Sequence, residues 1–244
     1  MAEKTYHEQE RNKCILELRR LQSELPKFLK DYFRGIEYST APRTQIAYAT
    51  DLKTFFEYIK DTNSMYKNTD IHDIDLGILS RLNAQDIEEY LDYLKLYTKN
   101  GHELANDERA IKRKLSALRS MYHYYHKNRI IKENPVTQVD LPKIHKKQII
   151  RLDDEVGELL NVVESGEHLT KKQSECHDKL KVRDTAILTL LLGTGIRVSE
   201  CVGINLDDVD YINDRIKIVR KGGYESFVYY GEEVRQALLD YMEE

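Results

Sequence analysis

The stretch RDTAILTLLLGTGIRVSE, residues 183–200, decides how the second half of the chain folds. Residues 184–192 are almost continuously apolar, which predicts a buried helix. The Gly193-Thr194-Gly195 turn predicts the end of this helix, because glycine tolerates the backbone geometry of a helix terminus. A short helix is expected from about Val198. Arg197 therefore lies at a helix start, directly after a tight bend.

Downstream of this stretch the pattern changes to that of a β-hairpin. Residues 215–220 alternate as a strand does, with Ile216 and Ile218 on one face. Gly222-Gly223 is a two-residue hairpin turn signal, and residues 224–230 are the predicted return strand.

Three further segments of this half have weaker signals. Residues 152–155 predict a capped helix start, and residues 166–179 are polar enough to predict a loop. Residues 232–242 predict a last amphipathic helix. The second half is therefore expected to mix helices with one hairpin.

The first half is predicted to be entirely helical. Residues 5–33 have the pattern of a polar helix that breaks just before Pro26, because proline disrupts a helix interior. Residues 39–42 signal the start of a second helix, and a loop is expected over about residues 61–80.

Two more helices are predicted in the first half. One opens at Asn83 or Ala84 and is closed by Asn100-Gly101, and the other covers about residues 106–128. The last helix carries an apolar stripe and, on a neighbouring face, a polar stripe. The apolar stripe is Ile111, Leu115, Leu118, Tyr122 and Tyr125, and the polar stripe is Lys112, Ser116, Arg119, His123 and His126.

Charge is distributed unevenly along the 244 residues. The chain has a net charge of −4, yet residues 108–147 hold eleven Lys or Arg against three acids, a net of +8. Such a local excess suits contact with nucleic acid, although a solvated helix face explains the charge equally well. Within this stretch, residues 136–150 contain Pro142 and little periodicity, which predicts an interdomain linker.

Composition excludes several classes of protein. No run of about eighteen apolar residues exists, so no membrane span is expected. The first residues have no apolar core of a signal peptide, and the three cysteines lack metal-ligand spacing. We therefore expect a cytoplasmic protein with reduced thiols.

Residues 183–200, followed by NLDDV at 205–209, resemble the first-arginine box of tyrosine recombinases, the phage-integrase or Xer-like family. The family places a catalytic lysine in a GKG turn between two strands; here the turn is RKGG, residues 220–223, with Arg220 in place of the first glycine. Thr44, Tyr48 and the IKRKLSALRSMY string at 111–122 are similar to its core-binding helices. The resemblance covers about residues 40–242.

The resemblance implies a mainly α fold with a small antiparallel β-hairpin or sheet. A helical core-binding domain at 36–140 would follow an N-terminal helical extension at 1–35. A linker at 141–150 would lead into the front of an α+β catalytic domain at 151–244. The implied activity is site-specific DNA recombination or integration through a 3′-phosphotyrosine intermediate, without metal, ATP or other cofactor.

The resemblance also implies roles for individual residues. Arg197 would hold the non-bridging oxygens of the scissile phosphate, because a guanidinium offers fixed, forked donors. Lys221 would protonate the leaving 5′ oxygen as general acid, and Glu200 would orient Arg197 or a neighbouring base. The expected DNA contacts are Arg43, Thr44, Arg109, Lys112, Arg113, Lys114, Arg119, Lys146 and Lys147. The implied partner is a duplex with inverted-repeat sites, bound by a homo- or hetero-tetramer of protomers.

Taken without the resemblance, the same residues admit simpler explanations. Arg197 on its own could cap a helix or pair with Asp207, and Lys221 could be an ordinary hairpin charge. The His-x-x-Arg box and the nucleophilic tyrosine of the family are not found, since no histidine follows His177. We therefore expect a C-terminally incomplete chain that does not cleave DNA. The alternatives are a non-catalytic regulator that occupies recombination sites and a helical protein-interaction domain.

Overall fold

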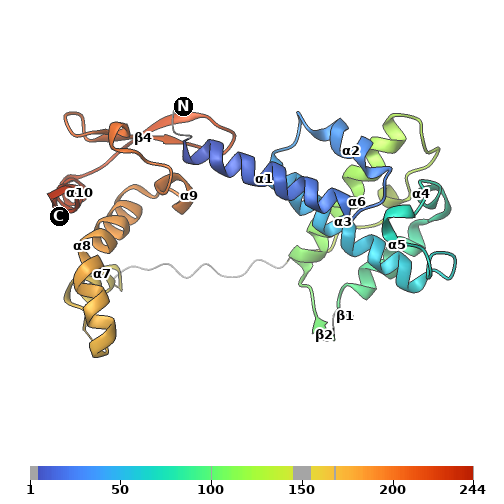
Figure 1. The fold of residues 1–244 in the computed structure, drawn as a ribbon, viewed down its shortest axis with the longest axis horizontal. Helices are drawn as coiled ribbons and strands as arrows, with labels where there is room; N and C mark the ends of the chain where they lie inside the picture. Colours follow the sequence, from blue (N-terminus) through green and yellow to red (C-terminus); the bar gives the residue numbers. More distant parts are fainter. Residues whose placement is uncertain (1–4, 100, 145–154, 168, 244) are drawn as a thin grey trace. The chain divides into compact units, whose positions relative to one another are not determined.

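The computed structural model describes residues 5–99, 101–144, 155–167 and 169–243. The chain divides into two compact units, Met1–Lys147 and Gln148–Glu244. Most of the described residues are helical, with short antiparallel strands in each unit (Figure 1). The predicted fold class, mainly α with small antiparallel β elements, is confirmed. No described helix is both long and apolar enough to cross a membrane.

The first unit is built around two long helices, α3 and α6. Its elements in chain order are α1 (Tyr6–Ser23), α2 (Leu29–Ile36), α3 (Pro42–Thr62), η1 (Ile71–Asp73), α4 (Ile78–Arg81), α5 (Ala84–Tyr93), β1 (Tyr97–Lys99), β2 (His102–Leu104), α6 (Glu108–Lys127) and η2 (Pro135–Gln138). The apolar stripe predicted for α6 is buried, with Leu115 and Tyr122 fully so. Phe55 of α3 packs edge-on against Tyr90 of α5 in the same core.

The predicted break before Pro26 is confirmed. Helix α1 ends at Ser23 and α2 begins at Leu29. Leu21, near the end of α1, and Leu25, within the break, are buried in the same core as α3 and α6. The stretch expected as an N-terminal extension therefore shares its apolar core with the following helices.

Two predictions in this unit are wrong. The expected loop over 61–80 contains η1 and the start of α4. Asn100-Gly101 does not close a helix: α5 ends at Tyr93, and Gly101, with φ +78°, turns the chain between β1 and β2. The same dipeptide is a strong hairpin signal, and in this segment the hairpin geometry wins over the helix terminus.

The second unit places a three-stranded sheet beside helices. Its elements are α7 (Glu155–Ser165), α8 (Lys171–Thr194), α9 (Val198–Cys201), η3 (Leu206–Asp208), β3 (Val209–Asp210), β4 (Arg215–Val219), β5 (Glu225–Tyr229) and α10 (Glu232–Glu243). The sheet is antiparallel in the order β3-β4-β5, and α10 packs against α8 (Figure 1). Ile216 and Ile218 share the buried face of β4, as predicted.

Helix α8 is longer than the sequence pattern indicates. The predicted loop at 166–179 is wrong from Lys171 onward, because Thr170 and Gln173 form a capping box that starts the helix there. This first part of α8 is largely exposed, so it lacks the apolar periodicity that marks a helix. At its other end, Gly193 allows close packing of α10, since a Cβ there would lie 2.6 Å from the Val234 side chain.

Candidate functional site

Arg197 and Glu200 form the anchor of the candidate site in the second unit. Arg197 is the N-cap residue of α9, directly after Gly195 ends α8. Its backbone amide and its guanidinium Nη1 each donate to the Glu200 carboxylate, both at 2.9 Å. The Glu200 side chain is 3% exposed and that of Arg197 is 67% exposed. The base of Arg197 is therefore fixed, while the guanidinium remains open to a ligand.

The β4–β5 hairpin is tied to the same carboxylate. Arg220, at the end of β4, brings its Nη1 to within 3.4 Å of Glu200 Oε2. The turn closes through hydrogen bonds from Arg220 N to Tyr224 O and from Gly223 N to Arg220 O. Gly222 has φ +96°, which a side chain disfavours. Glu200 thus joins α9 to the hairpin.

Lys221 lies at the exposed tip, one residue beyond Arg220. Its ammonium makes no hydrogen bond or ion pair with the residues that the structure describes. The other cations of β4 are neutralised in place: Arg215 by Asp210 at 2.8 Å and Lys217 by Asp208 at 3.4 Å. Among the described residues Lys221 therefore has no acid partner, and Arg197, although paired with Glu200, is 67% exposed.

The electrostatics of Glu200 keep this carboxylate ionised. The hydrogen bond from the Arg197 backbone amide is the largest cause that holds the pKa of Glu200 below its usual value. Burial opposes that effect, and the Arg197 and Arg220 guanidiniums reinforce it. Glu200 pairs with both Arg197 and Arg220, and Arg197 has this partner in place of Asp207. Among the described residues, no three His, Cys, Asp or Glu side chains are grouped to hold a metal.

In the first unit, the expected DNA contacts fall into two groups. Arg109 is exposed and Lys112 is half-buried on the polar face of α6, and neither has an ion pair among the described residues. Arg43 is exposed in the first turn of α3 and pairs with Glu10 of α1 at 2.9 Å, beside half-buried Thr44. These four side chains remain within reach of a ligand.

Arg113 and Lys114 are instead bound to a buried carboxylate. Asp51 of α3 is 0% exposed and accepts from Arg113 Nη1 at 2.6 Å and from Lys114 Nζ at 3.2 Å. Lys114 itself is only 7% exposed, which differs from the expectation that it faces DNA. Position 114 lies three residues after Ile111, so the helix turns it toward the core.

Arg119 also has a structural partner. Its Nη2 donates to the carbonyl of Val139 at 2.6 Å, which holds the segment after η2 against α6. Its Nε is buried and has no partner in the described part of the chain. Lys146 and Lys147 lie outside the described residues.

Residues 152–244 match the model of the phage integrase family. The tyrosine recombinase XerC of Caldanaerobacter subterraneus subsp. tengcongensis is 32% identical over 226 residues, covering 89% of this chain and 58% of that protein. Residues 152–244 therefore form a phage integrase family domain, and the chain is similar to tyrosine recombinases over most of its length. Tyrosine recombinase XerC of Leptospira interrogans is 31% identical over 221 residues, covering 91% of this chain and 62% of that protein.

The chain spans about three fifths of the length of these two relatives. A solved structure of the XerH site-specific recombinase, bound to palindromic difH substrate, is similar with a TM-score of 0.57. That likeness has 16% identity and covers 84% of this chain and 54% of the XerH chain, so it concerns the fold alone.

Two features of this chain were missed in the sequence. Arg220 stands where the family turn has glycine, and its pairing with Glu200 becomes visible only once α9 and the hairpin are folded together. The burial of Asp51 had a detectable signal in the sequence. Asp51 lies three residues after Tyr48 and one before Leu52, so it is on the same helix face as the apolar stripe of α3. An acid at a core position calls for a cation on the facing helix.

Proposed function

We propose that this chain supplies the DNA-binding and front catalytic part of a site-specific tyrosine recombinase. The observation that carries the proposal is Glu200, which holds Arg197 and Arg220 on one carboxylate and so brings the base of the Lys221 hairpin to the Arg197 helix. An exposed guanidinium on α9 and a hairpin ammonium without a partner among the described residues suit a phosphodiester, because both can donate to its charged oxygens. The family assignment of residues 152–244 agrees with this chemistry.

In the proposed reaction, a tyrosine oxygen attacks phosphorus and the bond from phosphorus to the 5′ oxygen breaks. Arg197 donates to the non-bridging oxygens, where negative charge grows in the transition state. Lys221 gives its proton to the leaving 5′ oxygen, and Glu200 acts through Arg197 as a positioning residue. The product is a 3′-phosphotyrosine, which retains the bond energy for rejoining, so no cofactor is needed.

The proposed DNA-binding domain is residues 36–140, after an extension at 1–35, with a linker at 141–150 and the catalytic part at 151–244. Arg43, Thr44, Arg109 and Lys112 are its proposed phosphate and groove contacts. The proposed substrate is a duplex with inverted-repeat sites in the cytoplasm, occupied by four protomers. The DNA-bound XerH complex supports a duplex partner.

A salt titration tests the DNA-binding part of the proposal. We expect affinity for an inverted-repeat duplex to fall steeply with salt, because each phosphate contact releases a counterion. Lys112→Ala should reduce the slope of log affinity against log salt by about one unit. Lys95→Ala, which removes a lysine already paired with Asp92, is the matched control and should leave the slope unchanged. A flat response for the parent chain would favour a protein-interaction domain.

A nicked suicide duplex tests the catalytic part. The 244 residues hold no histidine after His177, so a non-catalytic DNA-binding role is the second candidate for these residues alone. We expect no covalent adduct from them, and an adduct that depends on Arg197 from a longer chain that carries a nucleophilic tyrosine. A covalent adduct from these 244 residues would contradict the proposed division of the site.

A further inference from the structure

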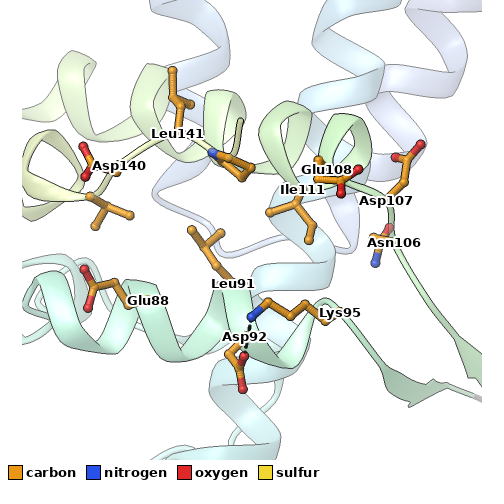
Figure 2. A pocket seen from close by; sticks show the side chains of 12 residues that line it. Glu88, Leu91, Asp92, Lys95, Asn106, Asp107, Glu108, Ile111, Asp140 and Leu141 are labelled. Carbon is orange, nitrogen blue, oxygen red and sulfur yellow. Dashed lines mark hydrogen bonds and ion pairs between the residues drawn. The ribbon is translucent and has the colours of Figure 1, made fainter. Parts of the chain in front are cut away.

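The first unit carries a groove that the proposed DNA contacts do not use. It lies between α5, the start of α6 and the segment after η2, and has a volume of about 520 Å³. Figure 2 shows Leu91 rising from α5 toward α6 and Ile111 pointing down from α6 toward α5. Val139 and Leu141 complete an apolar floor. We call this the acidic groove, for the charges at its edge.

The edge of the acidic groove is strongly negative. Its carboxylates are Glu88, Asp92, Asp107, Glu108 and Asp140, against the single ammonium of Lys95. The Lys95 ammonium forms an ion pair with Asp92 at 2.8 Å (Figure 2). Glu88, Glu108 and Asp140 have no ion pair with the described residues. Glu108 and Asp140 are two of the three acids in the basic stretch 108–147.

The carboxylates at the edge of the acidic groove exclude a phosphate backbone as its occupant, because phosphates and carboxylates are both negatively charged and repel each other. The groove suits a polypeptide that inserts an aliphatic side chain between basic residues. The aliphatic side chain of such an occupant packs on the apolar floor, and its basic residues pair with the carboxylates of the edge.

The opposite end of α6 presents such a segment. Ile130 is 49% exposed and stands between exposed Arg129 and, two residues further on, exposed Lys132. Hydrogen bonds from Arg129 N to His126 O and from Ile130 N to Tyr125 O close the helix in a Schellman motif. Arg129 has φ +57°, a left-handed conformation that is costly for a residue other than glycine. We call residues 129–132 the basic turn.

We propose that the basic turn of one copy docks in the acidic groove of a second copy of this chain. Ile130 enters the floor between Leu91 and Leu141, and Arg129 and Lys132 pair with carboxylates of the edge. Helix α6 has 20 residues, so its rise of about 1.5 Å per residue puts about 30 Å between the two surfaces. The basic turn therefore cannot reach the acidic groove of its own chain. The contact joins one end of α6 in one copy to the opposite end of α6 in the next copy, so it runs head to tail.

A head-to-tail contact closes into a ring or continues as a chain, unlike a self-complementary dimer. One aliphatic anchor and a few exposed ion pairs make a weak contact, which becomes populated when copies are held close together. The inference rests on the first unit alone and does not depend on the proposed recombination activity. It is therefore tested without DNA.

Directed disulfide cross-linking provides the test. In the full 244-residue chain, Cys14, Cys176 and Cys201 are replaced by serine, and one variant carries Ile130→Cys while another carries Leu141→Cys. We expect the mixture of the two variants to cross-link about tenfold faster than Leu141→Cys mixed with Leu16→Cys, because docking raises the effective concentration. Leu16 is an apolar residue on α1 that is 64% exposed, against 49% for Ile130, so it is at least as accessible and serves as the matched control.

Charge reversal identifies the docked geometry. Adding Glu88→Lys to the Leu141→Cys variant should lower the rate of cross-linking with Ile130→Cys to that of the Leu16 control. Adding Lys132→Glu to the Ile130→Cys partner as well should restore the faster rate. Circular dichroism checks that each variant keeps the parent fold. Cross-linking at the control rate, or a rate indifferent to both reversals, would overturn the proposal. Neither result would bear on DNA binding, which the salt titration measures separately.

Discussion

Two buried carboxylates, one in each unit, hold pairs of cations in opposite ways. Asp51 in the first unit and Glu200 in the second are both inaccessible to solvent, and each accepts from two basic side chains. Burial raises the pKa of Asp51 even though Lys114 and Arg113 lower it. The pKa of Glu200 lies below its usual value, chiefly through the hydrogen bond from a backbone amide.

The difference comes from what surrounds each carboxylate. Asp51 faces an ammonium that is itself buried, so the pair is surrounded by core and serves to join α3 to α6. Glu200 sits at the start of α9, where a main-chain donor and the helix terminus favour an anion. Its arginine partners extend into solvent. The first arrangement buries Lys114 and holds Arg113 against α3, and the second leaves both of its arginines accessible to a ligand.

The largest expected effect is that of removing Asp51. Asp51→Ala leaves the Lys114 ammonium buried without a counter-charge, and we expect it to lower the free energy of unfolding by about 3 kcal/mol. Urea denaturation followed by circular dichroism measures this loss. Combining Asp51→Ala with Lys114→Met removes the stranded charge and should recover most of the stability. If the double variant is no more stable than the single one, the buried pair does not join the helices as described.

Removing Glu200 should cost less stability and release the hairpin. Glu200→Ala loses a helix cap and one partner of two arginines that water can hydrate, so we expect a loss of about 1 kcal/mol. The hairpin should become mobile, and trypsin should cut after Lys221 several times faster than in the parent chain. Arg220→Ala keeps the α9 cap and serves as the control: it should speed cleavage while leaving stability nearly unchanged. Cleavage at the parent rate in both variants would show that Glu200 does not restrain the hairpin.

Much of the architecture around Glu200 was predictable because it is local. The end of α8 at residues 193–195, the start of α9 and the β4–β5 turn each depend on a few adjacent residues, and the structure has them where the sequence placed them. The exposed start of α8 was missed because a solvated helix has no apolar period. The Asp51 cluster joins residues more than sixty positions apart, and no local pattern encodes such a pairing.

The residues of the candidate site were predictable only as separate positions. Arg197, Glu200 and Lys221 were selected through the family resemblance, and their roles remain predictions. The interaction that only the folded chain reveals is the hydrogen bond from Arg220 to the second carboxylate oxygen of Glu200, because the two residues are twenty positions apart in the sequence. In the first unit, the family resemblance implied that both Lys112 and Lys114 contact DNA, whereas the helix turns Lys114 inward and leaves Lys112 accessible.

The smallest expected effect is a difference in the sign of pH dependence. The pKa of Glu200 is depressed below 4.5 in the folded chain, so its stabilisation is present above that value and is lost as pH falls through the folded pKa. The pKa of Asp51 is raised above 3.8, so the folded chain holds this proton more tightly than the unfolded chain does. Its contribution is therefore present at low pH and is lost as pH rises through the folded pKa.

Amide variants separate the two contributions. Urea unfolding between about pH 3 and pH 6 compares the parent chain with Glu200→Gln and with Asp51→Asn, neither of which titrates at the substituted position. The stability of the parent relative to Glu200→Gln should rise with pH, and its stability relative to Asp51→Asn should fall with pH. Slopes of the same sign would mean that the two carboxylates sit in equivalent environments. In that case the proposed difference between Asp51, which joins two core helices, and Glu200, which holds arginines toward a ligand, would fail. That difference depends on a main-chain donor that offsets burial at Glu200 and not at Asp51.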